Sequence, residues 1–404
     1  MAAPKIRFKE FSENWGSKKI IELADYVDYR GKTPKKVESG VLLVTAKNIK
    51  QGYLDYSASQ EFIEESAFDD VMRRGKVELN DVLITTEAPL GNVASVDRTD
   101  IALAQRVIKY RGKTGLLDNL FLKQKFLSES FQEILKSKAT GGTVQGIKGS
   151  VLHQIPLIVP SKEEQTKIAT FLSAVDEKIS QLSQKLHLLG QYKQGMMHKL
   201  FSQQLRFKAD DGSEFGDWED KPLNEIACKN TIKNKDGSIT EVLTNSAIQG
   251  IIKQSDYFER EIVTESNLIG YYLVNVNDFV YNPRISVHAP VGPIKRNKKC
   301  LGIMSPLYTV FTIKTGNLNY LEYFFDCDFW HDYVKSVANS GARHDRMNIT
   351  NKDFFEMPIL YPCLKEQTKI ANFLSAIDQK IDVVSEQLEQ AKLWKKGLLQ
   401  QMFV

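Results

Sequence analysis

The 404 residues suffice for two or three domains, and a hydrophobic content of 42% gives each domain the material for a core. The chain has no run of about 18 apolar residues, which excludes a membrane-spanning helix, and its first residues show no signal core. Four scattered cysteines and six histidines form neither CxxC nor HxxxH pairs, so we expect free thiols, no metal site and a cytoplasmic protein. The net charge of +4 gives little support for nucleic-acid binding.

Residues 1–155 are predicted to form a globular domain of mixed α/β structure. The β-branched and aliphatic runs Val41–Val44 and Val82–Thr85 predict strands, and Leu116–Leu135 predicts helix. Asn80 and Asp81 stand directly before the second run and predict a turn that leads into it.

Two polar, glycine-containing segments of this domain, Arg30–Pro34 and Thr140–Gly146, are candidate binding loops. Such loops can bring backbone N–H groups and Arg or Gln side chains to phosphates and base edges. An ordinary surface loop is the alternative for each. The candidate DNA-binding residues here are Arg30, Lys32, Thr33, Gly142, Thr143, Gln145 and Lys148.

Residues 156–205 predict a long helix that begins after Pro160, with acidic Glu163 and Glu164 suited to the helix dipole. Its apolar positions step by four and three residues, which is the seam of a coiled coil. An amphipathic helix lying on its own domain is the alternative, but so narrow and long a seam favours another helix as its partner. The seam consists of Ile168, Leu172, Val175, Ile179, Leu182, Leu186 and Leu189.

Residues 206–357 predict a second α/β domain, and Asn277-Asp278 predicts the same turn into a strand as in the first. The polar segment 339–346 stands where Thr140–Gly146 stands in the first domain, just ahead of the apolar run that leads to a long helix. The basic cluster Lys295–Lys299 is better explained as a solvated turn. The candidate DNA-binding residues here are Asn282, Arg284, Ser286, His288, Arg343, His344 and Arg346.

Residues 358–404 repeat the first helix. Pro156–Phe201 aligns with Pro358–Phe403 without a gap, and 20 of the 46 positions are identical. Trp15 and Trp218 anchor a weaker match near the start of each copy, whereas the sequences between diverge. The residues predicted to pair the helices or to face a partner are Gln165, Ile168, Leu172, Ile179, Gln367, Ile370, Leu374 and Ile381.

The order domain, helix, domain, helix predicts the architecture. Like units most often pair about a two-fold axis, and such an axis makes the two helices an antiparallel coiled coil. We therefore expect an α/β protein with a pseudo-two-fold internal repeat, whose two domains read two different DNA half-sites at a separation that the helices fix.

Motifs for catalysis are fragmentary. Gly31-Lys32-Thr33 and Gly112-Lys113-Thr114 resemble the end of a phosphate loop, but the earlier glycine of that motif is missing. Asn282-Pro283-Arg284 lacks the second proline and the aromatic residue of the amino-methyltransferase box, and no GxGxxG or GxSxG occurs. The sequence therefore favours a binding protein over an enzyme.

The repeated segment Glu-Gln-x-x-Ile-Ala-x-Phe-Leu-Ser-x-hydrophobic-Asp, found at Glu164–Asp176 and Glu366–Asp378, carries a family resemblance. Followed each time by a heptad helix, it resembles the specificity subunit of Type I restriction-modification systems, and the resemblance spans the whole chain. The turn Gly31-x-Thr33-Pro34 also resembles the first domain of that family, but the second copy lacks it.

The resemblance implies two target-recognition domains that each read one half of a split DNA sequence. The helices would set the gap and dock two modification subunits, which would methylate adenine with S-adenosylmethionine. Restriction subunits would add translocation and cleavage with ATP and Mg²⁺. The chain itself would hold no cofactor.

A coiled-coil adaptor that joins two protein-binding domains is the alternative function. It fits the near-neutral charge, but it does not explain why the domains diverge while the helices are kept. DNA binding that weakens steeply with salt would distinguish the reader from the adaptor.

Overall fold

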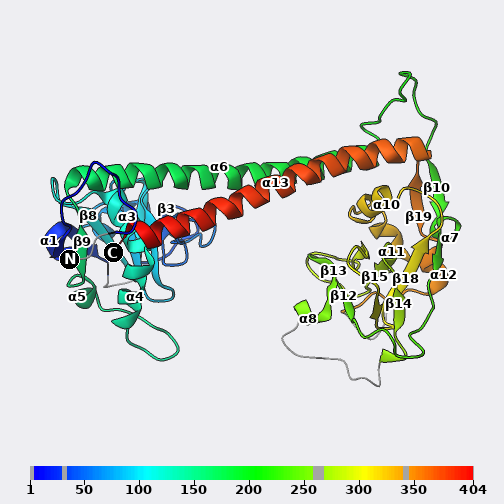
Figure 1. Ribbon diagram of the computed structural model, residues 1–404, viewed down its shortest axis with the longest axis horizontal. Helices are drawn as coiled ribbons and strands as arrows, with labels where there is room; N and C mark the ends of the chain where they lie inside the picture. The colour runs from blue at the N-terminus through cyan, green and yellow to red at the C-terminus, as the bar shows by residue number, and fades with distance from the viewer. Residues whose placement is uncertain (1–3, 30–33, 258–267, 340–344, 404) are drawn as a thin grey trace. The chain divides into compact units, whose positions relative to one another are not determined.

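The computed structural model describes residues 4–29, 34–257, 268–339 and 345–403. The chain forms two compact units: unit 1 contains Met1–Gln184 with Ser385–Val404, and unit 2 contains Lys185–Val384 (Figure 1). The division runs through the middle of each long helix, whereas the boundaries predicted from the repeat lie outside the helices, after residues 155, 205 and 357. Among the described residues, no helix is long and apolar enough to cross a membrane.

The domain of unit 1 contains a four-stranded antiparallel sheet in the order β2-β8-β5-β6. A three-stranded sheet, β4-β3-β7, lies beside it and contains a parallel pair, and β1 pairs with β9. The predicted strands are confirmed as β3 and β5. The strands are β1 (Gly16–Lys19), β2 (Ala24–Asp28), β3 (Val41–Val44), β4 (Phe62–Ile63), β5 (Val82–Thr86), β6 (Leu90–Ser95), β7 (Ile101–Leu103), β8 (Val107–Gly112) and β9 (Pro156–Val159).

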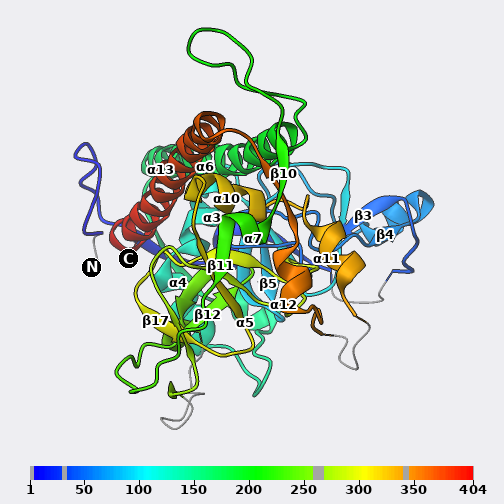
Figure 2. The ribbon, with the colours of Figure 1, turned by 90° about the vertical axis from the view of Figure 1, so that its right-hand side faces the viewer.

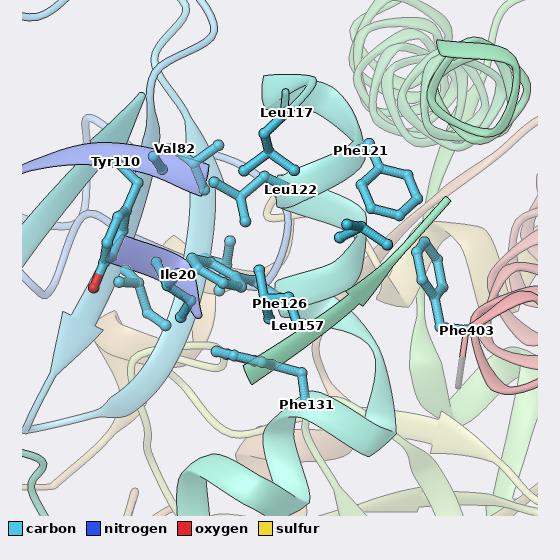
Figure 3. Packing of buried hydrophobic residues seen from close by; sticks show 14 of the residues in the cluster. Ile20, Val82, Tyr110, Leu117, Phe121, Leu122, Phe126, Phe131, Leu157 and Phe403 are labelled. Carbon is cyan, nitrogen blue, oxygen red and sulfur yellow. The ribbon is translucent and has the colours of Figure 1, made fainter. Parts of the chain in front are cut away.

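The predicted helical segment Leu116–Leu135 is two helices, α3 (Asn119–Leu127) and α4 (Glu129–Ser137). The break falls at Ser128, whose hydroxyl accepts a hydrogen bond from the Phe131 N–H and so caps the second helix. Helix α3 packs on the main sheet, and its aromatic residues fill the core shown in Figure 3. The shorter helices of this domain are α1 (Ile20–Leu23), η1 (Glu65–Ala67), α2 (Phe68–Val71) and α5 (Gly149–Leu152).

The domain of unit 2 has a four-stranded sheet in the order β11-β18-β15-β16, which corresponds to the main sheet of unit 1. Elements of unit 2 are labelled in Figure 2. Its strands are β10 (Glu219–Pro222), β11 (Ala227–Lys229), β12 (Leu243–Ser246), β13 (Gly250–Lys253), β14 (Tyr272–Val274), β15 (Phe279–Tyr281), β16 (Ile294–Arg296), β17 (Gly302–Met304), β18 (Thr309–Ile313) and β19 (Pro358–Tyr361). Its helices are α7 (Leu223–Ile226), α8 (Gln254–Tyr257), α10 (Leu318–Phe325), α11 (His331–Val337) and α12 (Asn351–Phe355).

The predicted turn into a strand is confirmed in both domains. Asn80 and Asn277 have positive φ angles of 66° and 77°, a conformation that asparagine tolerates better than most residues. The buried Asp81 and Asp278 follow, and the carboxylate of each accepts the backbone N–H three residues earlier at 2.8 Å. Both copies of the domain have this turn, whose hydrogen bonds satisfy a buried carboxylate where the strand begins.

The two long helices, α6 (Lys162–Phe201) and α13 (Leu364–Met402), confirm the heptad prediction. Helix α6 passes from unit 1 into unit 2 and α13 passes back, so they run in opposite directions within each unit (Figure 1). The predicted seam positions of α6 are buried or half-buried: Ile168, Leu172, Val175, Ile179, Leu182, Leu186 and Leu189. So are the positions that the ungapped repeat pairs with them in α13: Ile370, Leu374, Ile377, Ile381, Val384, Leu388 and Ala391.

The helix contacts in one unit recur in the other with α6 and α13 exchanged. Lys395 of α13 pairs with Asp176 of α6 at 2.5 Å in unit 1, and Lys193 of α6 pairs with Asp378 of α13 at 2.6 Å in unit 2. Burial alone would raise the pKa of Asp176, but its neighbours Lys123 and Lys395 outweigh burial, so the pKa is lowered.

Aromatic residues near the helix ends follow the same exchange. The Phe403 ring at the end of α13 lies 5.4 Å from that of Phe121 in unit 1 (Figure 3). The Phe201 ring at the end of α6 lies 5.4 Å from that of Tyr320 in unit 2. Each unit thus builds its core from its own domain and from one end of each long helix.

The glutamate of the repeated motif anchors each helix to its domain. Glu164 and Glu366 are 1% and 0% exposed, and each accepts two hydrogen bonds from one arginine. Arg7 binds Glu164 at 2.7 Å through both Nε and Nη2, and Arg206 binds Glu366 at 3.1 and 2.9 Å. The hydrogen bonds to Glu366 raise the pKa of Arg206.

The glutamine of the motif is buried in the same place. The Gln165 Oε1 accepts the N–H of Asp118, which caps α3, and its Nε2 donates to the carbonyls of Leu116 and Pro160. Gln367 does the same with Asn317, which caps α10, and with Pro362. Both glutamines, predicted to serve the helix pair or a partner, lie inside their own unit and fix where the long helix begins.

Replacing Arg206 with alanine leaves the Glu366 carboxylate buried, and the one side-chain donor that remains to it among the described residues is the Trp218 indole N–H, 3.0 Å away. We expect the free energy of unfolding of unit 2 to fall by about 3 kcal/mol, because an uncompensated buried charge is costly. Urea unfolding measures this value. Lys352→Ala is the control, since it removes an exposed Lys352–Glu356 pair and should cost less than about 1 kcal/mol. Equal losses in the two variants would contradict the anchoring role.

Candidate nucleic-acid interface

Two separate stretches of unit 2 that contain predicted site residues meet in the structure. The loop between β15 and β16 pairs with the segment that begins at Asp345. The Ile285 N–H donates to the Asp345 carbonyl at 3.0 Å, and the Met347 N–H donates to the Pro283 carbonyl at 2.9 Å. These two hydrogen bonds pair Arg284 with Arg346 in an isolated antiparallel β-bridge, so the two arginines are neighbours.

Asn282 holds the loop in shape. Its Oδ1 accepts the Arg284 N–H at 3.0 Å, and its Nδ2 donates to the Asn245 carbonyl at 3.0 Å. Burial raises the pKa of Tyr281, so its hydroxyl stays protonated and donates to the Val291 carbonyl at 2.8 Å. Asn282 thus positions the residues that follow it, and its amide has a second N–H and a second oxygen lone pair beyond these two bonds.

Ser286 and Ala289 close a tight turn. Each N–H donates to the other's carbonyl, at 3.0 and 3.1 Å, and the Ser286 hydroxyl also accepts the Ala289 N–H. The two residues at its tip, Val287 and His288, are exposed.

A cavity of about 590 Å³ lies between these loops and the β12–β13 hairpin. Five predicted residues line it: Asn282, Arg284, Ser286, His288 and Arg346. The lining includes guanidinium, imidazole, hydroxyl and amide groups, which suits the hydrogen-bonding edges and phosphates of a nucleic acid. No sequence pattern marks the other lining residues, because they are single polar or apolar side chains in a strand, in turns and in a short helix: Ser246, Ile248, Gln254, Leu307 and Tyr308.

In unit 1, the loop Gly141–Gln145 is closed by two hydrogen bonds between Thr140 and Gly146, at 2.8 and 2.9 Å. It lies against the turn that follows β5, where the peptide between Ala88 and Pro89 is cis. A cavity of about 600 Å³ is lined by both segments and by Lys136, which sequence reasoning missed. The predicted residues Gly142, Thr143 and Gln145 line this cavity, and Lys148 is exposed just after the loop.

Five predicted residues lie outside the described part of the chain: Arg30, Lys32, Thr33, Arg343 and His344.

The two sites occupy the same place in their domains. In unit 1 the Ile147 N–H donates to Thr86 at the end of β5, and in unit 2 the Met347 N–H donates to Pro283 after β15. Each site therefore joins the loop that leaves a central strand to the loop that precedes a short helix, α5 or α12. The residues on these loops differ, so the two sites present different hydrogen-bonding groups.

Charged residues near the sites also differ. In unit 1, Arg106 pairs with Glu87 at 2.7 Å beside the loop, and in unit 2 Arg346 lies 3.8 Å from Asp345. Among the described residues, no three His, Cys, Asp or Glu side chains gather as metal ligands would. All four cysteines are free, as predicted.

A substitution at Gly292 tests whether the loop between β15 and β16 can shift to admit a side chain. Its φ is +84°, and a Cβ atom there would lie 2.1 Å from the Asn282 carbonyl oxygen. We expect Gly292→Ala to lower the free energy of unfolding by about 3 kcal/mol, from backbone strain and a backbone clash together. Gly250→Ala is the matched control, because Gly250 has a φ of +69° and no atom within 4 Å of its added Cβ, so only strain of about 1 kcal/mol applies. Similar losses for both variants in urea unfolding would mean that the loop can relax around the clash.

The family model for the Type I restriction modification DNA specificity domain matches the chain twice, over residues 12–189 and 216–393. The Type I restriction enzyme MjaVIII specificity subunit of Methanocaldococcus jannaschii is 24% identical, over 96% of this chain and 91% of its own length. The putative Type I restriction enzyme MjaX specificity subunit of the same organism is 25% identical, over 98% and 94%.

Two solved structures share the fold. The crystal structure of the S subunit of a Type I restriction-modification system from M. genitalium superposes with a TM-score of 0.57 at 16% identity, covering 100% of this chain and 99% of that one. A chain from a structural study of complex assembly in the Type I R-M system gives a TM-score of 0.53 at 15% identity, covering 98% of both. With its two copies of the domain, the chain belongs to the Type I restriction-modification DNA specificity family.

Proposed function

We propose that this chain is the specificity subunit of a Type I restriction-modification complex and reads a bipartite DNA sequence, one half with each domain. One observation carries the proposal. The family model matches the chain twice, and in each match two polar loops meet at the same place in the domain. A protein-binding adaptor has no need of two polar cavities at equivalent positions with different linings.

In unit 2, the exposed Arg284 and the half-buried Arg346 are the proposed contacts to phosphates or to guanine, whose O6 and N7 accept a bidentate guanidinium. Ser286 and His288, whose side chains are shorter than that of arginine, would add contacts to base edges. Arg343 and His344, which lie outside the described residues, stay predicted contacts.

In unit 1, Gln145 is the proposed base-reading side chain, since a glutamine amide both donates and accepts and can pair with adenine. Thr143 and the backbone of Gly142 would contact the DNA beside it, with Lys136 and Lys148 on the phosphates. Arg30, Lys32 and Thr33 stay predicted contacts of this half.

The long helices would set the gap between the two half-sites. An α-helix of 40 residues such as α6 is about 60 Å long, and two helices paired along an apolar seam resist bending.

The helices also offer a docking surface for modification subunits. Tyr192 of α6 and Trp394 of α13 occupy equivalent positions in the repeat, and they are 51% and 54% exposed. Exposed aromatic side chains of this kind are typical anchors of protein interfaces. We propose that each copy binds one modification subunit here.

The proposal assigns the chemistry to partner subunits. Modification subunits would bind S-adenosylmethionine and methylate an adenine flipped out of the duplex, and restriction subunits would use ATP and Mg²⁺. This chain would hold no cofactor and supply no catalytic residue.

Co-expression with a cognate modification subunit, followed by mapping of methylated adenines across the host genome, tests this function. We expect a two-part motif with a gap of constant length, because each domain reads one half and the helices fix the separation. Expressing either subunit alone is the control and should give no such methylation. A contiguous motif, or no motif despite an assembled complex, would contradict the proposal.

A further inference from the structure

Val287 is an apolar side chain in the polar site of unit 2, and it is 93% exposed. It stands at the tip of the turn closed by Ser286 and Ala289. Its neighbours Ser286 and His288 line the cavity, whereas Val287 is absent from the lining. Val287 therefore projects from the rim into solvent.

The fold does not account for a valine at this tip. Tight turns favour Gly, Asn, Asp or Ser, which supply the backbone conformations or local hydrogen bonds that turns need. Val287 belongs to none of the hydrophobic clusters of the described residues and so adds nothing to the core. Among the described residues nothing covers its apolar surface, which is open to a molecule outside the chain.

The surroundings indicate which kind of molecule. The guanidinium-bearing residues Arg284 and Arg346 line the same cavity, so the valine stands on a rim that attracts anions. Two further apolar side chains line this cavity and are well exposed, Ile248 at 72% and Leu307 at 60%. Apolar tips beside cationic groups match the edge of a DNA groove, where phosphates flank the bases.

In the major groove, the apolar group by which one base is told from another is the C5-methyl group of thymine. We propose that Val287 is a specificity-determining residue that packs on the methyl group of a thymine in the half-site read by unit 2. This inference rests on the proposed function and adds the group that is read.

The test uses the full chain assembled with its modification subunits and duplexes that carry its methylation motif. Each thymine of the unit 2 half-site is replaced in turn by deoxyuridine, which removes only the methyl group. We expect one replacement to weaken binding by about four-fold, the effect of losing one buried methyl-sized contact. In Val287→Ala, thymine and uridine at that position should bind alike.

Val144→Ala is the matched control, because Val144 is an exposed valine, at 59%, on the candidate loop of unit 1. It should keep the four-fold discrimination in the unit 2 half-site. Thermal unfolding of Val287→Ala should match the wild type, since the side chain is exposed.

Three results would overturn the inference while leaving the proposed function intact: a half-site without thymine, full binding to every uridine duplex, or undiminished discrimination in Val287→Ala. Failure of Val287→Ala to assemble with modification subunits would also overturn it and would indicate a protein contact instead. If the wild-type complex binds no two-part sequence, the proposed function fails and the inference with it.

Discussion

The rest of the structure depends on the burial of two apolar helix seams against each other. A helix with a narrow stripe of Ile, Leu and Val is not stable alone in water, because most helical stability in proteins comes from packing. Here each half of α6 packs with the opposite half of α13, and the ends of both helices enter a domain core. Neither unit is complete with one copy of the repeat, so the chain is organised by the pairing of its copies.

This constraint explains what is kept and what varies between the copies. The motif glutamate and glutamine are buried at the point where each helix leaves its domain, and Asp176 and Asp378 bind lysines from the opposite helix. A change at any of these positions leaves a buried polar group or charge without its partner. The side chains of Arg284 and Gln145 lie on the candidate loops and face solvent. These side chains can therefore change without disturbing the core.

Much of the fold could be predicted from the sequence because its signals are local. The four-three spacing of Ile168, Leu172 and Val175 predicts the helix pair, and Asn80-Asp81 predicts the turn into β5. The candidate site could be predicted only in part. Arg284 and Arg346 are more than 60 residues apart, and backbone hydrogen bonds between two irregular loops bring them together without leaving a sequence pattern.

Two sequence interpretations gained a different physical meaning. Asn282 stays a predicted contact residue and lines the cavity, and its amide also shapes the loop through hydrogen bonds with Arg284 and Asn245. Gln165 was predicted to pair the helices or to face a partner because it lies in the repeated motif, and in the structure it is 1% exposed and fixes the helix start. Neither outcome could be predicted from spacing, because both depend on carbonyl groups supplied by distant or irregular backbone.

The central claim is that a repeated helix framework carries two independent DNA-reading domains. It is tested most directly by replacing residues 1–155 with the corresponding domain of a relative that reads another sequence. The junction precedes β9, whose pairing with β1 uses only backbone groups and should form in the hybrid. Mapping methylated adenines in cells that express the hybrid with modification subunits should show one half of the motif changed, with the other half and the gap length retained. A change in both halves, or a new gap length, would contradict the claim.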